Sequence, residues 1–327
     1  MYGHYQLFED ERGLAGGMGY ASIANRVSYA LDLHGPSLAV DTMCSSSLTA
    51  IHLACEALAG GSADYALAGG VNLTPHPRKY RQLAAGGFTG ETGRCRSFAV
   101  GGDGMVPGEG VGAVLLKPLA AAERDGDRIL GVILGSAVNH GGKTGGYAVP
   151  SPGAQSEVVT SALRAAGVEP ASVSYVEAHG TGTALGDPAE VAGLARAFGD
   201  RPPGSIAIGS VKSSIGHLES AAGIAALTKV LLQMRAGELT PSLHAEQLNP
   251  AVDWANVPFR VQRETAPWTG PHPLRAGVSA FGAGGSNAHL VVEQYRAEPR
   301  PGVAPVPAVF PFSGRDAQAL RRVSSGC

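Results

Sequence analysis

Cys44 has the clearest chemical potential in this sequence, because it stands between an apolar run and an Ala-rich run. PSLAVDTM (36–43) predicts a buried strand, and SSLTAIHLACEALAG (46–60) predicts a helix that ends at a Gly pair. The sulfur would then lie at a helix N-terminus, where the dipole and the free N–H groups favour a thiolate. Cysteine is also among the most frequently buried residues. Position alone therefore leaves a nucleophile and a structural cysteine both open.

Two histidines occupy a similar setting, each next to the end of a predicted strand. His179 follows SVSYVEA and begins HGTGT, whereas His217 follows KSSIG and precedes an Ala-rich helix. The carboxyl end of a strand is a favoured ligand position in α/β folds. A single histidine is usually a surface or core residue, so the argument depends on the pair. We expect both to belong to a functional site.

Several Gly-rich segments suggest phosphate loops, but their patterns do not fit. GGDGMVPGEGVG (101–112) lacks the GK[ST] ending of a P-loop. GVSAFGAGGSNAHLVVE (277–293) lacks the dinucleotide spacing, and a turn that presents N–H groups to an oxyanion fits it better. His140, in NHGGKTGGY, lies in a further loop that could contact a ligand. A strand-to-helix GxSxG turn is missing, which argues against a serine hydrolase.

The elements that must position these residues alternate between strands and helices. Strands are predicted within 64–73, 128–139, 172–180 and 205–211, helices within 156–170, 187–200 and 218–237, and a strand followed by a helix within 110–127. Asp187 is expected at the N-cap of the helix 187–200, with Pro188 in its first turn. This alternation favours parallel strand pairing and a layered α/β fold.

An internal echo accompanies the alternation. SLAVDTMCSSSLTAIHLACEAL and SIAIGSVKSSIGHLESAAGIAALTKVLL each contain an apolar strand, a turn with Ser-Ser and an Ala-rich helix. Two related units of this kind suggest a duplicated core. Coincidence between two common strand-turn-helix units is the alternative interpretation.

Composition excludes several classes of protein. The 327 residues include 25 basic and 27 acidic side chains, so nucleic acid is a poor partner. The polar start is unlike a signal peptide, and no apolar run reaches about 18 residues, so no membrane span is expected. The four cysteines form no C-x-x-C pair. We therefore expect no metal site, and a reduced, cytoplasmic enzyme.

Four segments together resemble the β-ketoacyl synthase (ketosynthase) domain of modular type I polyketide synthases. They are DTMCSSSLTAIHLAC, EAHGTGTALGDP, KSSIGHLESAAG and GVSAFGAGGSNAHLVVE, within a match from about Tyr20 to Tyr295. GPSLAVDTMCSSSLTAIHLAC and VNHGGKTGGY are most similar to the branch served by a separate, trans-acting acyltransferase. The resemblance implies a thiolase-like layered αβαβα fold with duplicated halves. Only 43 residues precede Cys44, so an N-terminally truncated, incomplete first half is expected.

The resemblance also divides the chain. Residues 1–120 would form the partial N-terminal half with the nucleophile, and residues 121–295 the C-terminal half with both histidines. Residues 296–327 would form a truncated linker, since RAEPRPGVAPVPAV contains five prolines. The following PAVFPFSGRDAQALRR is similar to the segment that succeeds a ketosynthase in such megasynthases.

The resemblance assigns roles to individual residues. Cys44 would accept the acyl group, and His179 and His217 would complete a Cys-His-His site. Lys212 would support the second histidine through Asp187 or Glu190. Substrate contacts would come from Thr181 and Thr183, which match threonines that bind a phosphopantetheine arm, and from Phe281, Gly282 and Ala283 in a gating and oxyanion loop. Because fatty-acid relatives carry a phenylalanine at the position of Ala283, this chain should admit bulkier acyl groups.

The implied activity is a decarboxylative Claisen condensation in polyketide biosynthesis, with the growing acyl chain held on Cys44. The domain would bind no cofactor of its own, since its substrates arrive on the phosphopantetheine of acyl carrier protein. Acyl carrier protein, other polyketide synthase domains and a second copy of the chain are the expected partners. A non-catalytic remnant that only binds such partners is the alternative. A thiolase or chalcone-synthase-like enzyme fits less well, because HGTGT and SSIGH occur together.

Overall fold

The computed structural model describes residues 19–297 and 313–324 of the chain. It contains two compact units, Met1–Tyr295 and Arg296–Cys327. Helix α10 (Ala317–Ser324) belongs to the second unit. The Pro-rich part of the expected linker, 298–312, lies outside the described residues. Everything that follows concerns the first unit.

A six-stranded sheet forms the centre of this unit. Its order is β3 (Val132–His140), β10 (Ser286–Glu293), β9 (Arg275–Phe281), β4 (Tyr175–Glu177), β5 (Ile206–Gly209) and β7 (Phe259–Val261). The neighbours β9, β4, β5 and β7 run parallel, as the alternating pattern predicts. By contrast, β10 is antiparallel to both β3 and β9, because a tight turn joins it to β9.

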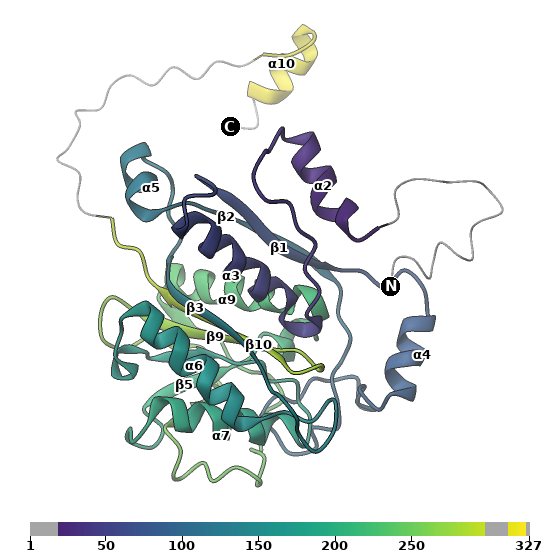
Figure 1. Cartoon of the computed structure of the whole chain (residues 1–327), viewed down its shortest axis with the longest axis vertical. Helices are drawn as coiled ribbons and strands as arrows, with labels where there is room; N and C mark the ends of the chain where they lie inside the picture. Colours follow the sequence, from purple (N-terminus) through teal and green to yellow (C-terminus); the bar gives the residue numbers. More distant parts are fainter. Residues whose placement is uncertain (1–18, 298–312, 325–327) are drawn as a thin grey trace. The chain divides into compact units, whose positions relative to one another are not determined.

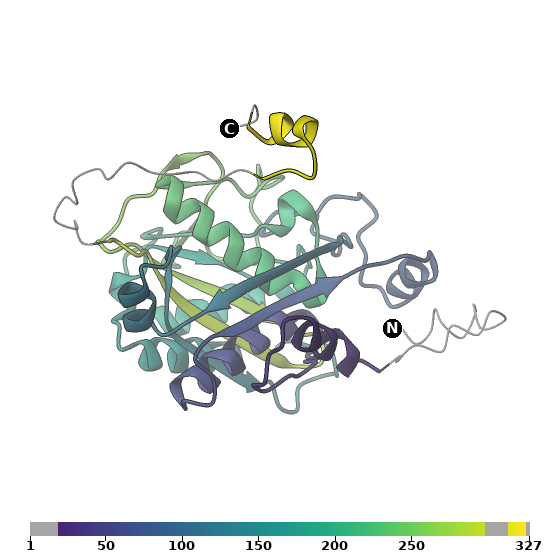
Figure 2. The same cartoon turned by 90° about the horizontal axis from the view of Figure 1, so that it is seen from above.

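Helices cover both faces of this sheet (Figures 1 and 2). On one face lie α6 (Pro152–Ala166) and α7 (Gly186–Phe198), which pack against each other. On the other face lie α3 (Ser46–Ala59) and α9 (Ala222–Ala236), with β1 (Ala66–Asn72) and β2 (Gly110–Leu116) beyond them. The remaining elements are α2 (Ala21–Ala30), η2 (Met43–Ser45), α4 (Arg78–Ala85), α5 (Leu119–Asp125), η3 (Pro170–Ser172), α8 (Lys212–Ile215), η4 (Glu219–Ala221), β6 (Glu238–Leu239) and β8 (Ala266–Pro267).

Local sequence signals explain where these helices begin and end. Ser151 caps α6, because its Oγ accepts a hydrogen bond from the N–H of Ala154, and Pro152 occupies the first turn. The helix ends at Gly167, whose φ of +63° suits a residue without a Cβ. Asp187, however, does not cap α7; Leu185 holds that position, and the aspartate lies inside the first turn. Its carboxylate is used elsewhere, as described below.

The two central helices carry the main hydrophobic core. Leu48 and Ile51 of α3 are fully buried, and Leu227 and Val230 of α9 are at most 2% exposed. They pack with inward side chains of β9 and β10 in one cluster. Burying one such side chain contributes about 1.5–3 kcal/mol, so this layer contributes substantially to stability, beside a second cluster that includes α6 and α7.

The first half differs from the second in the part of the chain that is described. Its sheet is the antiparallel pair β1–β2, against six strands in the other sheet. The predicted strand 36–43 is wrong: the segment is irregular, and Leu38 is 64% exposed. A strand needs a partner ladder, and no described strand pairs with this segment. Val111 and Leu115 of β2 are 79% and 64% exposed.

Two sequence-level expectations can be compared with the described residues. Within 19–297 and 313–324, no helix is both long and apolar enough to cross a bilayer. The three cysteines in these ranges, Cys44, Cys55 and Cys95, are all free thiols.

A substitution in α9 tests the importance of the central helix layer. Leu227→Ala should lower the free energy of unfolding by about 2–5 kcal/mol, because it leaves a cavity beside α3 and the sheet. Leu232→Ala on the same helix is the matched control, because Leu232 is 58% exposed and should change stability by no more than about 0.5 kcal/mol. Urea unfolding curves of both variants would measure this, and equal effects would contradict the layer assignment.

Candidate active site

The structure brings the three candidate catalytic residues together. Cys44 lies in the turn η2, His179 follows β4, and His217 lies between α8 and η4. One nitrogen of each imidazole and the Sγ of Cys44 all lie within 4.8 Å of one another. The two imidazole rings meet edge to face, with centroids 5.4 Å apart. Three side chains far apart in the sequence thus form one cluster, as predicted.

Hydroxyl groups fix the turn that carries the cysteine. Met43, directly before Cys44, has a φ of +55°, which is rare for a residue with a side chain. Ser46 Oγ donates to the carbonyl of Met43 at 2.6 Å, which closes the turn. Ser45 Oγ lies 2.9 Å from the carbonyl of Ser286, at the start of β10. The serines after Cys44 therefore tie the nucleophile turn to the sheet.

The sulfur of Cys44 lies in an apolar environment that favours the thiol. Burial raises the pKa of Cys44 to about 11, although the charge of Lys212 opposes the rise. The backbone N–H groups of Ala283 and of Cys44 itself also face the sulfur, and they too oppose the rise in pKa. The expected thiolate at a helix N-terminus is therefore not the resting form, because desolvation outweighs the dipole. The two N–H groups remain available to an oxyanion.

His217 is a neutral hydrogen-bond donor directed into the cluster. Its Nδ1 accepts the backbone N–H of Glu219 at 2.8 Å, so the proton of the neutral ring must be on Nε2. That Nε2 is buried and has no hydrogen-bond partner. Burial first, and then the charges of Lys212 and Lys79, hold the pKa of His217 well below its usual range. The imidazole is therefore neutral near pH 7.

His179 is held through its backbone. Its N–H donates to Glu190 Oε1 at 2.7 Å, and the N–H of Gly180 donates to Oε2 of the same carboxylate at 2.8 Å. The ring lies 5.7 Å from that of Phe281, centroid to centroid, and its Nδ1 is buried without a partner. Burial, with Lys212 and His217 nearby, keeps the pKa of His179 well below the usual value.

The two predicted supporting carboxylates act on the first histidine and not on the second. Glu190 binds the His179 segment as described, and Asp187 accepts the N–H groups of Phe98 at 2.6 Å and Gly182 at 3.1 Å. Both groups are buried, which raises the pKa of Asp187 to about 6 and that of Glu190 to about 7. They brace the HGTGT loop because its N–H groups converge on them, which sequence spacing does not reveal.

Lys212 lies beneath the cluster and acts on it electrostatically. It is 2% exposed, and burial lowers its pKa, while Cys95, Glu177, Glu190 and Cys44 raise it. Its positive charge in turn helps to keep both imidazoles neutral. Sequence reasoning missed Glu177, the last residue of β4.

Glu177 joins Lys212 to a buried polar network. Its Oε1 accepts the N–H of Val211 at 2.6 Å, immediately before Lys212. Its Oε2 accepts from Lys229 at 2.7 Å and from the hydroxyl of Tyr175 at 2.6 Å. The signal in the sequence was a carboxylate inside an apolar strand, which must have buried partners.

The predicted substrate-contact residues occupy two loops. The hydroxyls of Thr181 and Thr183 lie 3.2 Å apart, and Thr183 Oγ1 also accepts the N–H of Gly186 at 3.1 Å. Gly282 donates its N–H to Ser286 O at 2.7 Å, and a Cβ on it would collide with the carbonyl of Thr42. Only glycine therefore lets the 281–285 turn approach the nucleophile turn so closely.

His140 binds this same turn. Its Nε2 donates to the carbonyl of Gly284 at 2.9 Å, and its Nδ1 accepts the N–H of Gly142 at 3.0 Å. The Gly-rich loop that the sequence singled out thus contacts the residue after Ala283. His140 thus holds Gly284, the neighbour of Ala283, whose backbone N–H faces the sulfur of Cys44.

The Cys-His-His cluster does not suit a metal ion, although its donor atoms are close enough to invite one. A metal on Nε2 of His217 would require the proton to move to Nδ1. Nδ1 would then face the N–H of Glu219, so two donors would be opposed. The positive charge of Lys212 is also unfavourable for a cation. The donor set is built for hydrogen bonding and nucleophilic chemistry.

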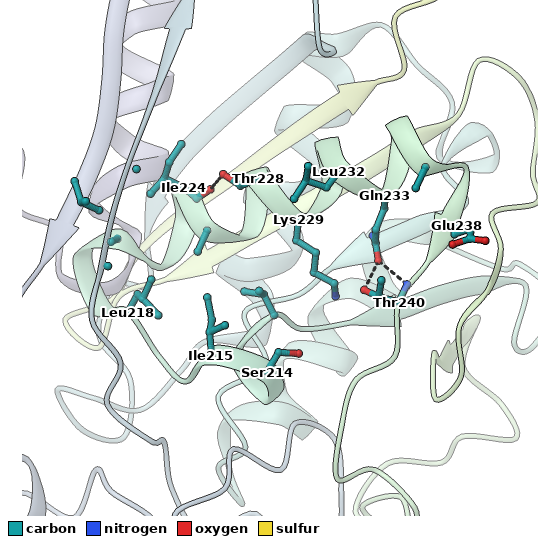
Figure 3. A pocket seen from close by; sticks show the side chains of 17 residues that line it. Ser214, Ile215, Leu218, Ile224, Thr228, Lys229, Leu232, Gln233, Glu238 and Thr240 are labelled. Carbon is teal, nitrogen blue, oxygen red and sulfur yellow. Dashed lines mark hydrogen bonds between the residues drawn. The ribbon is translucent and has the colours of Figure 1, made fainter. Parts of the chain in front are cut away.

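A separate cavity of about 600 Å³ lies between β2 and α9 (Figure 3). Ile224, Thr228 and Leu232 of α9 line it, and none of the three cluster residues does. Lys229 also lines it, with its ammonium group turned to Glu177. This cavity therefore lies behind the network that supports Lys212.

Three domain families match the chain. "Beta-ketoacyl synthase, N-terminal domain" matches residues 2–122, and "Beta-ketoacyl synthase, C-terminal domain" matches residues 130–246. "Ketoacyl-synthetase C-terminal extension" matches residues 249–326. The chain belongs to the β-ketoacyl synthase family.

Curated relatives of this ketosynthase are polyketide synthases. It is 60% identical to polyketide synthase ThaG of Burkholderia thailandensis, over 91% of this chain and 6% of ThaG. It is 54% identical to polyketide synthase PksL of Bacillus subtilis, over 98% of this chain and 8% of PksL. The chain thus spans less than a tenth of these relatives.

Solved ketosynthases share its fold. The oxazolomycin ketosynthase domain OzmH KS7 of Streptomyces albus has a TM-score of 0.89 and 56% identity, covering 99% of this chain and 58% of that one. The ketosynthase from module 6 of the bacillaene synthase of Bacillus subtilis has a TM-score of 0.84 and 43% identity, covering 88% and 53%. These likenesses confirm the thiolase-like ketosynthase fold and the class, a condensing transferase of polyketide synthases.

The high pKa of the Cys44 thiol leads to a pH prediction. The thiolate fraction should rise about tenfold per pH unit between pH 7 and 9, because the pKa of about 11 lies above this range. Alkylation by iodoacetamide, quantified by mass spectrometry of the Cys44 peptide, should follow this rise. Cys44→Ser gives the background from the other thiols. A plateau below pH 8 would show that the resting site holds a thiolate.

Proposed function

We propose that this ketosynthase catalyses decarboxylative Claisen condensation in polyketide biosynthesis, with Cys44 as nucleophile. The observation that carries the proposal is the cluster of one half-buried thiol and two neutral imidazoles. His217 contributes an N–H without a partner, and the N–H groups of Cys44 and Ala283 face the sulfur. Such a site can accept an acyl group and then stabilise an enolate without a change in its own charge.

In the first step, Cys44 takes an acyl group from a pantetheine thioester. The sulfur attacks the thioester carbon, and the thiol proton passes to an imidazole of the cluster. The tetrahedral oxyanion is held by the N–H groups of Cys44 and Ala283. The C–S bond to pantetheine then breaks, its thiol takes up the proton, and the acyl group remains on Cys44.

In the second step, a malonyl-type thioester loses carbon dioxide. The Nε2–H of His217 and the ring of His179 hydrogen-bond the thioester oxygen, on which the enolate charge develops. The C–C bond to the carboxylate breaks, and its electron pair forms the enolate. The enolate carbon attacks the acyl carbon on Cys44, the C–S bond to Cys44 breaks, and the sulfur leaves as a thiolate that takes a proton from solvent. The product is a β-ketoacyl thioester two carbons longer.

The remaining residues receive roles that fit this sequence of steps. Thr181 and Thr183 would contact the phosphopantetheine arm, while Phe281, Gly282 and Ala283 would form the gating and oxyanion turn. Lys212, Asp187 and Glu190 would support the cluster, the carboxylates through the HGTGT loop. The division into residues 1–120, 121–295 and 296–327 is part of the same proposal.

The proposed partners and setting follow from the substrate chemistry. An acyl chain bound to phosphopantetheine must be delivered by acyl carrier protein, so the domain itself needs no cofactor. We assign the chain to the branch with a trans-acting acyltransferase, because of GPSLAVDTMCSSSLTAIHLAC and VNHGGKTGGY. It would act in the cytoplasm as a homodimer beside other polyketide synthase domains.

One observation favours the alternative of a non-catalytic binding module. The described sheet of the first half has two strands, and Val111 is 79% exposed on its outer face. A fragment that only binds carrier protein would keep this surface and lose acyl transfer. Acylation of Cys44 therefore distinguishes the two functions.

Acyl transfer to Cys44 can be measured directly. Incubation with a labelled acyl-pantetheine thioester should give an adduct of one acyl group on the Cys44 peptide in mass spectrometry. Cys44→Ala should abolish this adduct, and Cys55→Ala, which removes a free thiol within α3, should keep it. Undiminished label in Cys44→Ala would overturn the assignment of the nucleophile. A folded wild type without any adduct would favour the binding module.

Ala283 should determine which acyl groups are accepted. Ala283→Phe places a large ring beside the sulfur, so acylation by a branched long-chain thioester should fall by at least about tenfold. Acylation by an acetyl thioester should change by less than about threefold, since a small group needs little space. Parallel acylation rates with the two thioesters measure this. Equal losses would show that the residue acts on the oxyanion turn and not on acyl size.

A further inference from the structure

A buried ion pair lies behind His217, outside the residues that the mechanism uses. Lys79 of α4 is 2% exposed, and its Nζ lies 2.7 Å from Glu219 Oε1. The same ammonium donates to Asn72 Oδ1 at 2.7 Å. A lysine this deeply buried is expensive unless it is paired, so both contacts are needed to hold it.

Glu219 connects this pair to the catalytic histidine. Its backbone has a φ of +46°, a left-handed conformation that is unfavourable for a residue with a side chain. In that conformation its N–H points back to Nδ1 of His217, at 2.8 Å. The carboxylate of the same residue points to Lys79. One residue therefore carries both the strained turn and the charge that anchors it.

A second route runs from Lys79 to the backbone of the same histidine. Asn72, which accepts from Lys79, donates through Nδ2 to the carbonyl of Gly108 at 2.8 Å. The N–H of Gly108 donates in turn to the carbonyl of His217 at 2.9 Å. Lys79 thus contacts Glu219, which hydrogen-bonds the ring of His217, and Asn72, which is linked through Gly108 to the backbone of His217.

We propose that Lys79 and Glu219 are positioning residues that keep the proton of His217 on Nε2. The ion pair holds the left-handed turn at Glu219, and the turn directs its N–H to Nδ1. As long as this N–H occupies Nδ1, the neutral ring can carry its proton only on Nε2, which faces the cluster. The inference rests on the proposed function for its kinetic consequence, since decarboxylation needs that N–H donor.

The variants Glu219→Gly and Glu219→Ala distinguish the effect of the left-handed backbone conformation from the effect of losing the side chain. Glu219→Ala removes the anchor but leaves a Cβ that disfavours a positive φ. Glu219→Gly also removes the anchor, yet glycine adopts a positive φ freely. The glycine variant should therefore regain the hydrogen bond that the alanine variant loses. A residue that mattered only for packing or charge would give two equally impaired variants.

Kinetics and nitrogen-15 NMR of histidine-labelled protein test the proposal together. Glu219→Ala and Lys79→Met should each lower decarboxylation of a malonyl thioester by on the order of tenfold or more, with acylation of Cys44 within about threefold of wild type. Glu219→Gly and Lys79→Arg should remain within about threefold of wild type in both steps. The NMR signals of His217 should show the Nε2–H form in the wild type and a mixture of tautomers in Glu219→Ala. Glu157→Ala on the exposed face of α6 is the control.

Each outcome decides the matter. Wild-type decarboxylation and an unchanged tautomer in folded Glu219→Ala would overturn the proposal, as would equal loss in the glycine and alanine variants. The tautomer is read in the absence of turnover. If the wild type neither acylates nor decarboxylates but the tautomer still depends on Glu219, the proposed function fails and the positioning role stands.

Discussion

The close packing of α3 against α9 is the constraint on which the site depends. Ser47 Oγ accepts the N–H of Ile224 at 3.0 Å, at the point where both helices begin. Gly223 allows this approach, because a Cβ there would collide with the side chain of Leu48. Cys44 lies in the turn that enters α3, and His217 lies just before the turn that enters α9. Whatever fixes the two helix N-termini against each other therefore fixes Cys44 against His217.

Burial then sets the charge state of everything near this contact. Desolvation raises the pKa of Cys44 and lowers the pKa values of His179 and His217, so thiol and imidazoles are neutral together. Two carboxyl groups near the cluster have partners outside it: Glu190 accepts the backbone N–H of His179, and Glu219 pairs with Lys79. Nδ1 of His179 and Nε2 of His217 are buried and have no hydrogen-bond partner within the described residues. In the proposed mechanism, Nε2–H of His217 donates to the substrate.

Periodicity and turn residues in the sequence predicted the helices around the sheet and most of the strands, but not α2 or α4. They made Cys44, His179 and His217 candidates, and the resemblance to ketosynthases assigned their roles. These patterns failed where distant parts of the chain decide the outcome. The segment 36–43 has the apolar pattern of a strand but no described ladder partner. Asp187 is a residue type that often caps helices, yet its carboxylate accepts hydrogen bonds from the N–H groups of Phe98 and Gly182 in two other loops. The burial of Lys79 could not be predicted, because nothing in the neighbouring sequence distinguishes it from a surface lysine. Its burial depends on partners such as Asn72 and Glu219, which only the fold brings to it.

The neutral resting cluster explains how one site can perform two steps with opposite needs. Acylation needs a thiolate for an instant, whereas decarboxylation needs imidazoles that donate hydrogen bonds. A permanent thiolate–imidazolium pair would favour the first step, but a second ring nitrogen would be protonated and the hydrogen bond from Glu219 would be lost. With a thiol pKa of about 11, only a small fraction of Cys44 is thiolate near pH 7, and in the proposed mechanism the thiol loses its proton as it attacks the bound thioester. In that proposal His217 keeps the Nε2–H tautomer throughout, because its Nδ1 accepts the N–H of Glu219.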